Sequence, residues 1–363
     1  MTADSRYDLT IDQLATLIED QPAYRVRQVW DGLYQRLLAP TEMTDLPKAL
    51  RERLDREAPP ALAAALHLTS ASGDTDKILW RLHDETTVET VLMRYDDRVT
   101  VCVSTQVGCA MACGFCATGQ AGFDRHLTTG EIVEQVVAAA RIARPRRLSN
   151  VVFMGMGEPL ANFTHVVAAL HRLRDDLGLS ARHLTVSTVG IIPGIRRLAA
   201  EQLPLSLAVS LHAANDRLRN ELVPINRRYP LAALSQACAE YREATGRRIS
   251  LEWAMIAGTN DSDRDAQELA RFARPLRAHV NLIPLNPTPG WPTTASPRRR
   301  VREFRDLLDA AGVNATIRAN RGVDIDAACG QLRARHANTA SVTLKRRCDV
   351  SPDSGLIAAR LAA

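Results

Sequence analysis

Aromatic residues are scarce in this sequence, in which Phe, Trp and Tyr make up 4% of 363 residues. Proteins that bind single-stranded nucleic acid over a broad surface stack its bases on aromatic side chains, so this scarcity argues against such a platform. Long apolar runs are missing too, since no uninterrupted stretch approaches the ~18 residues that span a bilayer. The first residues, MTADSRYDLTIDQ, lack the basic start and apolar run of a secretory signal. We therefore expect a cytoplasmic protein without a membrane partner.

The sequence also has little excess charge of either sign, with a formal net charge of +5. Such a mild positive charge suits an anionic partner such as nucleic acid, but it does not identify one. Hydrophobic residues make up 46% and charged residues 24%, which is ordinary for a globular protein. The length is sufficient for one large α/β domain with a small appendage.

Cysteines are few, and in a reducing compartment they are not expected to form a structural disulfide framework. Metal binding or catalysis is then the better interpretation. The seven cysteines lie at positions 102, 109, 113, 116, 238, 329 and 348. Three of them fall within eight residues, which makes the segment from 109 to 116 the first candidate site.

From about residue 99 the sequence alternates short β-branched or apolar runs with longer helical patterns, which is typical of βα units around a parallel sheet. The predicted strands are 99–104, 150–154, 183–188, 204–211, 250–255, 278–282 and 314–318. The predicted helices are 129–143, 162–176, 193–201, 231–244, 262–273 and 298–311. Thr128 followed by Glu131 forms a capping-box pattern before the first of these helices.

Four regions are expected on this basis. Residues 1–75 read as a small helical domain, and 76–98 as a short β linker with strand-like segments at 77–80 and 88–92. Residues 99–337 form a partial (β/α) barrel of about six βα units, and 338–363 form a tail. In such folds the chemistry gathers on loops at the carboxyl ends of the strands. The cysteine cluster and several polar motifs do follow predicted strands.

Cys109-x3-Cys113-x2-Cys116 supplies three soft thiolates, which suit an iron–sulfur cluster or zinc. A structural zinc site normally has four ligands, and no CxxC or HxxxH partner appears elsewhere. A [4Fe–4S] cluster held by three cysteines leaves one iron open, which S-adenosylmethionine (SAM) can chelate through its amino and carboxylate groups. With Phe115 before the last cysteine, the spacing resembles the signature of radical SAM enzymes. Zinc, or three unrelated buried thiols, remains the alternative.

Other strand-end residues favour the same chemistry. Gly157 and Glu158, in Gly-Met-Gly-Glu-Pro after the second strand, offer backbone groups and a carboxylate for the ammonium of SAM. Ser187, Ser210 and His212 follow the third and fourth strands, although each alone is more often structural. Cys238 and Cys348 are interpreted as buried or surface thiols without a role. Small residues and glycine around Cys329 leave room for a substrate.

Seven separated motifs, in order along most of the chain, resemble the RlmN/Cfr family of radical SAM RNA adenine methyltransferases. The motifs are Glu89-Thr-Val, Cys102-Val-Ser-Thr-Gln-Val-Gly-Cys, Met154-Gly-Met-Gly-Glu-Pro-Leu, Ser210-Leu-His, Val223-Pro-Ile-Asn, Ile283-Pro-Leu-Asn-Pro and Ala327-Ala-Cys-Gly-Gln-Leu. A different radical SAM enzyme would need the cluster cysteines but not Cys102 and Cys329.

The resemblance implies specific roles. One SAM methylates Cys329, and a second SAM, cleaved at the cluster, gives a radical that activates this S-methyl group for addition to the adenine. Glu89 matches the residue that removes the ring proton. Cys102 resolves the enzyme–RNA adduct by forming a disulfide with Cys329. The positions that match SAM contacts are Gly157, Glu158, Ser187, Ser210, Leu211, His212 and Asn286.

The resemblance also implies partners. The substrate is an adenine of 23S rRNA, modified at C2 in one branch of the family and at C8 in the other, and the motifs lie closer to the C2 branch. Whether tRNA is a further substrate stays open. An electron donor such as flavodoxin or ferredoxin is implied, and a monomer is expected. The basic segments 141–147, 298–305 and 345–347 are candidates for phosphate contacts, although an arginine-rich helix face is usually just solvated. The N-terminal domain, residues 1–75, resembles the family's accessory RNA-contacting part and is the stronger candidate. The alternative of another class is a non-catalytic, metal-bearing RNA-binding protein.

Overall fold

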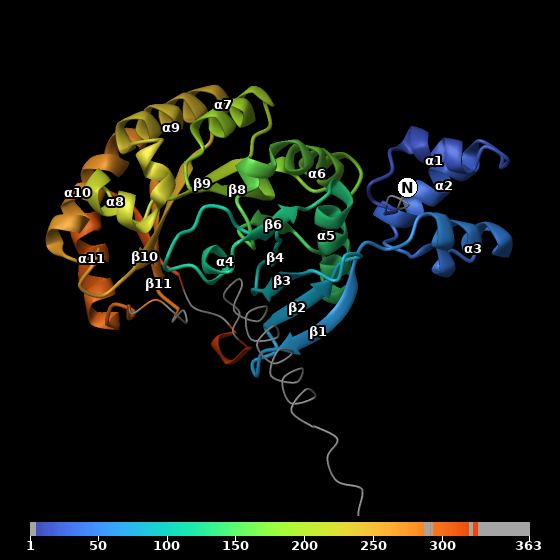
Figure 1. The fold of residues 1–363 in the computed structure, drawn as a ribbon, viewed down its shortest axis with the longest axis horizontal. Helices are drawn as coiled ribbons and strands as arrows, with labels where there is room; N and C mark the ends of the chain where they lie inside the picture. The colour runs from blue at the N-terminus through green and yellow to red at the C-terminus, as the bar shows by residue number, and fades with distance from the viewer. Residues whose placement is uncertain (1–4, 287–290, 292, 319–321, 326–363) are drawn as a thin grey trace, which may run out of the picture.

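The computed structural model describes residues 5–286, 291, 293–318 and 322–325. Among these residues, a ten-stranded sheet runs in the order β1-β2-β3-β4-β7-β8-β9-β10-β11-β12 (Figure 1). The pairs β1–β2, β2–β3 and β3–β4 are antiparallel. All the pairs from β4–β7 to β11–β12 are parallel. Their bounds are β1 Ala63–Thr69, β2 Thr75–Arg81, β3 Thr87–Arg94, β4 Val99–Cys102, β7 Asn150–Phe153, β8 Leu184–Thr188, β9 Ser206–Ser210, β10 Ile249–Met255, β11 His279–Pro284 and β12 Ala315–Ile317.

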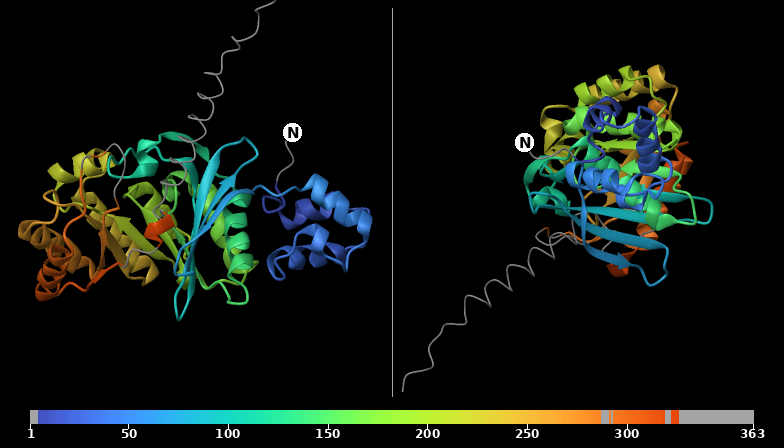
Figure 2. Two further views of the ribbon diagram at one scale, coloured as in Figure 1. Left: turned by 90° about the horizontal axis from the view of Figure 1, so that it is seen from below. Right: turned by 90° about the vertical axis from the view of Figure 1, so that its right-hand side faces the viewer.

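Helices follow the parallel strands and cover the outer side of the curved sheet (Figures 1 and 2). They are α5 Thr129–Ala143, α6 Phe163–Asp175, α7 Ile192–Ala200, α8 Asp216–Leu222, α9 Leu231–Thr245, α10 Asp263–Leu276 and α11 Arg298–Ala310. The predicted capping box of α5 is present, because the Thr128 side chain accepts from the Glu131 amide and the Glu131 side chain accepts from the Thr128 amide. The alternation confirms the predicted partial (β/α) barrel.

The two faces of the parallel sheet differ sharply in polarity. Alternate residues point to opposite faces, and the outer residues Val151, Val186, Leu207, Leu251 and Val280 are fully buried in the main core. The inner positions carry polar side chains that are register partners across the strands. They include Thr185, Ser206, Ser210, Ser250, Glu252, His279, Asn281 and Thr316. The inner face is therefore polar from β8 to β12, whereas on β3, β4 and β7 it carries an apolar cluster that includes Val91, Cys102 and Val152.

A small group of helices precedes the sheet: α1 Ile11–Leu17, α2 Tyr24–Tyr34 and α3 Lys48–Glu57. It lies beside α5 and α6 at one end of the molecule (Figure 1). Trp30 of α2 donates through Nε1 to Asp176 after α6 (2.9 Å), and Asp8 accepts from the Gly130 amide at the start of α5 (2.6 Å). Polar contacts therefore join the helices to the barrel.

Several elements differ from the sequence prediction. Residues 63–69 form strand β1, so the region expected to be helical to residue 75 has its last helix end at Glu57. Ala63-Ala-Ala-Leu has no β-branched residue, and it becomes a strand because β2 supplies an antiparallel partner. The sequence also did not predict α8, the short helix α4 (Ala117–Gln120) or the hairpin of β5 (Gln106–Gly108) and β6 (Phe123–His126). None of the described helices is long and apolar enough to cross a membrane.

Candidate active site

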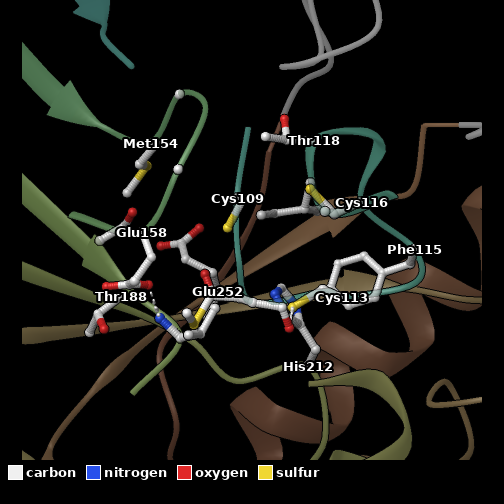
Figure 3. Close-up of a pocket in the computed structure, with 18 of the residues that line it drawn as sticks. Cys109, Cys113, Phe115, Cys116, Thr118, Met154, Glu158, Thr188, His212 and Glu252 are labelled. Atoms are coloured by element: carbon white, nitrogen blue, oxygen red, sulfur yellow. Dashed lines mark hydrogen bonds between the residues drawn. The ribbon is translucent and has the colours of Figure 1, made fainter. Parts of the chain in front are cut away.

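A cavity of about 210 Å³ lies at the carboxyl ends of the parallel strands (Figure 3). Its lining residues come from the cysteine loop, from the loops after β7, β8 and β9, and from the inner face of β10 and β11. Among them are Cys109, Cys113, Cys116, Gly157, Glu158, Ser187, Ser210 and His212. The structure therefore brings together eight of the residues that the sequence predicts for cluster and SAM binding.

The cysteine loop is held in a tight conformation between β5 and α4. The Cys109 amide donates to the Gly122 carbonyl (2.7 Å), and the Cys116 amide donates to the Cys113 carbonyl (3.1 Å). Gly119 allows α4 to pack on the loop, because a Cβ at this position would lie 2.8 Å from the Cys113 carbonyl oxygen. These backbone contacts hold the three cysteines around one cavity.

The chemistry of these thiols fits an iron–sulfur cluster. Burial raises the pKa of the Cys109 thiol to about 12 and also raises the pKa of Cys113. Coordination to a metal deprotonates such thiols. In a [4Fe–4S] cluster each cysteine binds a different iron, so the sulfurs surround a volume instead of converging on one point. Within the described ranges no group of three His, Cys, Asp or Glu side chains is close enough to hold a single metal ion.

The loop after β7 is attached to the segment that precedes Cys109. The Met156 amide donates to the Ser104 hydroxyl (3.0 Å), and the Glu158 amide donates to the Gln106 side-chain oxygen (2.8 Å). Gly157 has a positive φ of 103°, and a Cβ there would lie 2.6 Å from the side chain of Gln106. The glycine is therefore required both by the backbone conformation and by the close approach of the two loops.

Glu158 is buried at the wall of the cavity. Its two carboxylate oxygens accept from the amides of Leu160 (3.0 Å) and Val189 (2.8 Å), which connects the loops after β7 and β8. Burial raises the pKa of Glu158 to about 7, while these hydrogen bonds act in the opposite direction. The Thr188 side chain is a third hydrogen-bond partner, and a carboxylate has about four lone-pair sites, so Glu158 retains capacity for one further donor.

His212 has a defined tautomer. Its Nδ1 accepts from the Ala254 amide (3.0 Å), so the ring proton lies on Nε2. Burial lowers the pKa of His212 to about 3, which keeps the ring neutral. The ring also meets Phe115 edge-on at 4.8 Å between centroids. His212 therefore presents a neutral donor at the cavity, beside the cysteine loop (Figure 3).

The other predicted SAM contacts are placed differently. Ser187 lines the cavity, and its hydroxyl donates to the Phe153 carbonyl (2.6 Å). The Leu211 side chain is fully buried in the core between the cavity residues Ser210 and His212, and Leu211 is not among the described residues that line the cavity. Asn286 is half-buried after β11 and is not among the described residues that line the cavity.

Sequence reasoning missed Glu252 and Arg318, which also line the cavity. The carboxylate of Glu252 accepts from the Ser250 hydroxyl (2.7 Å) and from the side-chain amide of Asn281 (2.6 Å) on the neighbouring strand. These bonds orient an acidic group on the inner face of the barrel. The alternation of polar residues in Ser250-Leu-Glu-Trp was the available signal.

The predicted catalytic residues Glu89 and Cys102 lie on neighbouring strands, β3 and β4, and not among the cavity-lining residues. Cys102 is the register partner of Val91 and packs near Met154, which does line the cavity. Glu89 forms a fully buried ion pair with Lys77 (Nζ–Oε2 2.9 Å). The third predicted residue, Cys329, lies outside the described residues.

The basic segments are largely engaged within the protein. Arg141 pairs with Glu42 (2.7 Å), and Arg146 donates to backbone carbonyls. In α11, Arg299 pairs with Glu303 (2.6 Å) and Arg300 pairs with Asp263 (2.7 Å). The segment 345–347 lies outside the described residues. Phosphate contacts by the first two segments would compete with these existing partners.

Comparisons with known proteins agree with this site. A model of the radical SAM superfamily matches residues 103–273. The chain is 53% identical over 341 residues to a protein of Salinispora tropica described as a probable dual-specificity RNA methyltransferase RlmN, covering 90% of this chain and 92% of that protein. A protein of Rhodococcus erythropolis with the same description is 51% identical over 331 residues, covering 87% and 90%.

A solved structure shares the whole architecture. A radical SAM methyltransferase from Sphaerobacter thermophilus superposes with a TM-score of 0.87 at 49% identity, covering 90% of this chain and 98% of that chain. Both the extent and the level of identity are far beyond a shared fold alone. The chain therefore belongs to the RlmN family of dual-specificity RNA methyltransferases within the radical SAM superfamily.

Proposed function

We propose that this enzyme methylates C2 of an adenosine in 23S rRNA through an S-methylcysteine at Cys329, using two molecules of SAM. The observation that carries the proposal is the shared inner face of one sheet. The three-thiol cavity lies at the strand ends, and Glu89 and Cys102 lie on the adjoining strands β3 and β4. The three cluster cysteines and two of the three proposed catalytic residues, Glu89 and Cys102, therefore belong to one fold unit.

One set of cavity residues would bind the iron–sulfur cluster, and another set would bind SAM. Cys109, Cys113 and Cys116 would hold a [4Fe–4S] cluster, which, when bound, supplies the electron for cleavage of SAM to methionine and a 5′-deoxyadenosyl radical. The carboxylate of Glu158 is suited to the SAM ammonium, and the Nε2 proton of His212 to an acceptor atom of SAM. Gly157, Ser187, Ser210, Leu211 and Asn286 complete the proposed SAM site.

The thiols carry the methyl group. The Cys329 sulfur first takes the methyl of one SAM, leaving S-adenosylhomocysteine. Its S-methyl group then loses a hydrogen atom, and the methylene carbon bonds to the ring carbon of the adenine. The adduct would give its unpaired electron back to the cluster held by the three cysteines, and Glu89 would accept the displaced ring proton. The Cys102 thiolate attacks the Cys329 sulfur, so a disulfide forms as the carbon–sulfur bond breaks, and the released carbon is protonated to a methyl group.

Electrons balance over this cycle. Reductive cleavage of one SAM to methionine and 5′-deoxyadenosine consumes two electrons, and oxidation of the two thiols to a disulfide releases two. Cellular thiols then reduce the disulfide. An electron donor of the flavodoxin or ferredoxin kind is needed to start the reaction. We further propose that the enzyme acts in the cytoplasm as a monomer and that an adenosine of tRNA is a second substrate.

Mass spectrometry of nucleosides from 23S rRNA and tRNA tests the target. Cells with the gene should contain 2-methyladenosine that cells without it lack, and complementation with Cys329→Ala should not restore it. Cys238→Ala is the matched control, because Cys238 is a fully buried thiol of α9 outside the site. An 8-methyladenosine product would show that the methylated ring carbon is C8 and not C2. Methylation by Cys329→Ala at the native rate would contradict the role of Cys329 in the reaction.

Metal analysis of protein purified without oxygen tests the cluster. We expect about four iron and four sulfide per chain, and loss of both in Cys113→Ala. A colourless protein with stoichiometric zinc and no iron would contradict the proposal.

A further inference from the structure

Arg219 of α8 is fully buried and connects several loops of the active site. Its Nε donates to the Leu211 carbonyl (3.1 Å), and its Nη2 donates to the carbonyls of Val189 (2.6 Å) and Ser210 (3.3 Å). Its Nη1 donates to the side-chain oxygen of Asn226 (2.7 Å). Every one of these acceptors is neutral.

Arg219 therefore has no carboxylate of its own. None of the ion pairs among the described residues includes Arg219. The nearest acid in its hydrogen-bond network is Asp216, which accepts from the side-chain amide of Asn226 (2.9 Å) and not from Arg219. Burial lowers the pKa of Arg219 to about 10, so the side chain is still charged at neutral pH. A buried charge without a counter-ion is costly, and such a charge normally faces an anionic group.

Arg219 lies beside the wall of the cavity and beside the apolar cluster that contains Cys113. Two of its acceptors, Val189 and Ser210, are cavity-lining residues. Cys113 packs in one apolar cluster with Leu222 and Val223, and the Val223 amide donates to the Arg219 carbonyl (2.8 Å). The same arrangement explains the Val223-Pro-Ile-Asn motif, whose asparagine orients the guanidinium.

We propose that Arg219 is a positioning residue whose fixed positive charge serves as the counter-ion of the iron–sulfur cluster and raises its reduction potential. This inference rests on the proposed cluster. A [4Fe–4S] core of charge +2 bound to three thiolates has a net charge of −1, and reduction makes it −2, so a nearby cation stabilises the reduced form more than the oxidised form. The guanidinium then helps the cluster to accept an electron while it fixes the loops after β8 and β9.

The test is a redox titration of the anaerobically reconstituted full-length enzyme, followed by electron paramagnetic resonance without SAM. Arg219→Gln should shift the midpoint potential to more negative values. Arg219→Lys keeps the charge, so it should hold the potential near that of the native enzyme although it loses hydrogen bonds and thermal stability. Asp216→Asn removes the nearest acid and should shift the potential in the opposite direction, to more positive values.

These variants separate charge from structure. A native potential in Arg219→Gln, or an equal shift in Arg219→Lys and Arg219→Gln, would overturn the inference. Should Arg219→Gln fail to assemble a cluster, Asp216→Asn decides, and an unchanged potential there overturns it. A native protein that assembles no iron–sulfur cluster would instead refute the proposed function.

Discussion

Burial of Glu158 should make the proposed binding of SAM depend on pH. A carboxylate must be ionised to hold an ammonium, and burial raises the pKa of Glu158 to about 7. The ionised form is lost as the pH falls through this value, so we expect SAM affinity to weaken below about pH 7. Glu158→Gln should bind SAM roughly tenfold or more weakly and should lose most of this pH dependence. Calorimetric titration with SAM over a pH series measures both effects.

Glu134 provides the matched control. It is a second buried glutamate whose pKa burial raises to about 7, but it lies in α5 and accepts from the Ala61 amide (2.7 Å), away from the cavity. Glu134→Gln should therefore leave the pH dependence of SAM binding as it is in the native enzyme. A Glu158→Gln variant that keeps the native pH dependence would show that another group holds the ammonium.

Single residues were predictable where they stand in motifs. Gly157 stands in the Gly-Met-Gly-Glu-Pro motif, which made it predictable. Its positive φ and its close approach to Gln106 restrict this position to glycine. Glu252 stands in no motif, and its place depends on the pairing of β10 with β9 and β11. Sequence alternation predicts the face of such a residue, but only the assembled sheet shows which inner-face residues reach the cavity.

The strands β2 and β3 share a fully buried ion pair, Lys77 with Glu89. Removing one member of a buried ion pair is strongly destabilising and costs about 3–5 kcal/mol. We therefore expect Lys77→Met to lower the free energy of unfolding by about this amount in urea denaturation. The double variant Lys77→Met/Glu89→Met should recover much of the loss, because apolar residues replace both charges.

The control for this prediction is on the same strand. Arg81 forms an exposed pair with Glu85 (3.5 Å), and such surface pairs contribute about 0–1 kcal/mol. Arg81→Met should change stability far less than Lys77→Met. A double variant no more stable than Lys77→Met would mean that packing, not charge, dominates at this position.

Elements with strong periodicity were predicted well, because their own sequence determines them. Helix α5 was predicted over residues 129–143, its observed bounds, since the capping box marks its start. Strand β1 was missed because its alanine-rich sequence has no strand preference of its own. The hairpin β5–β6 was missed because strands of three and four residues are too short for a period to appear.

At the scale of the whole molecule, the N-terminal helices and the barrel meet through a few specific contacts. Trp30 is 5% exposed, and the Arg172 guanidinium lies 4.7 Å from its ring centroid. The Trp30 indole also donates to Asp176 (2.9 Å). These contacts hold the helices beside α5 and α6, at a distance from the cavity at the strand ends (Figure 1). If the N-terminal helices contact the RNA as predicted, mutation should separate this contact from the radical chemistry.

Trp30→Ala is the variant that should separate them. Loss of this large side chain should weaken the junction by about 3–5 kcal/mol, and Trp30→Phe, which keeps an aromatic ring but loses the hydrogen bond, by about 1 kcal/mol. If the helices grip RNA, Trp30→Ala should raise KM for an rRNA fragment with SAM affinity and iron content unchanged, and Trp30→Phe should show a smaller effect in the same direction. Steady-state methylation of the fragment together with SAM titration measures this. An unchanged KM for RNA would exclude the N-terminal helices from substrate binding, whereas a parallel loss of SAM affinity would show that the junction supports the barrel itself.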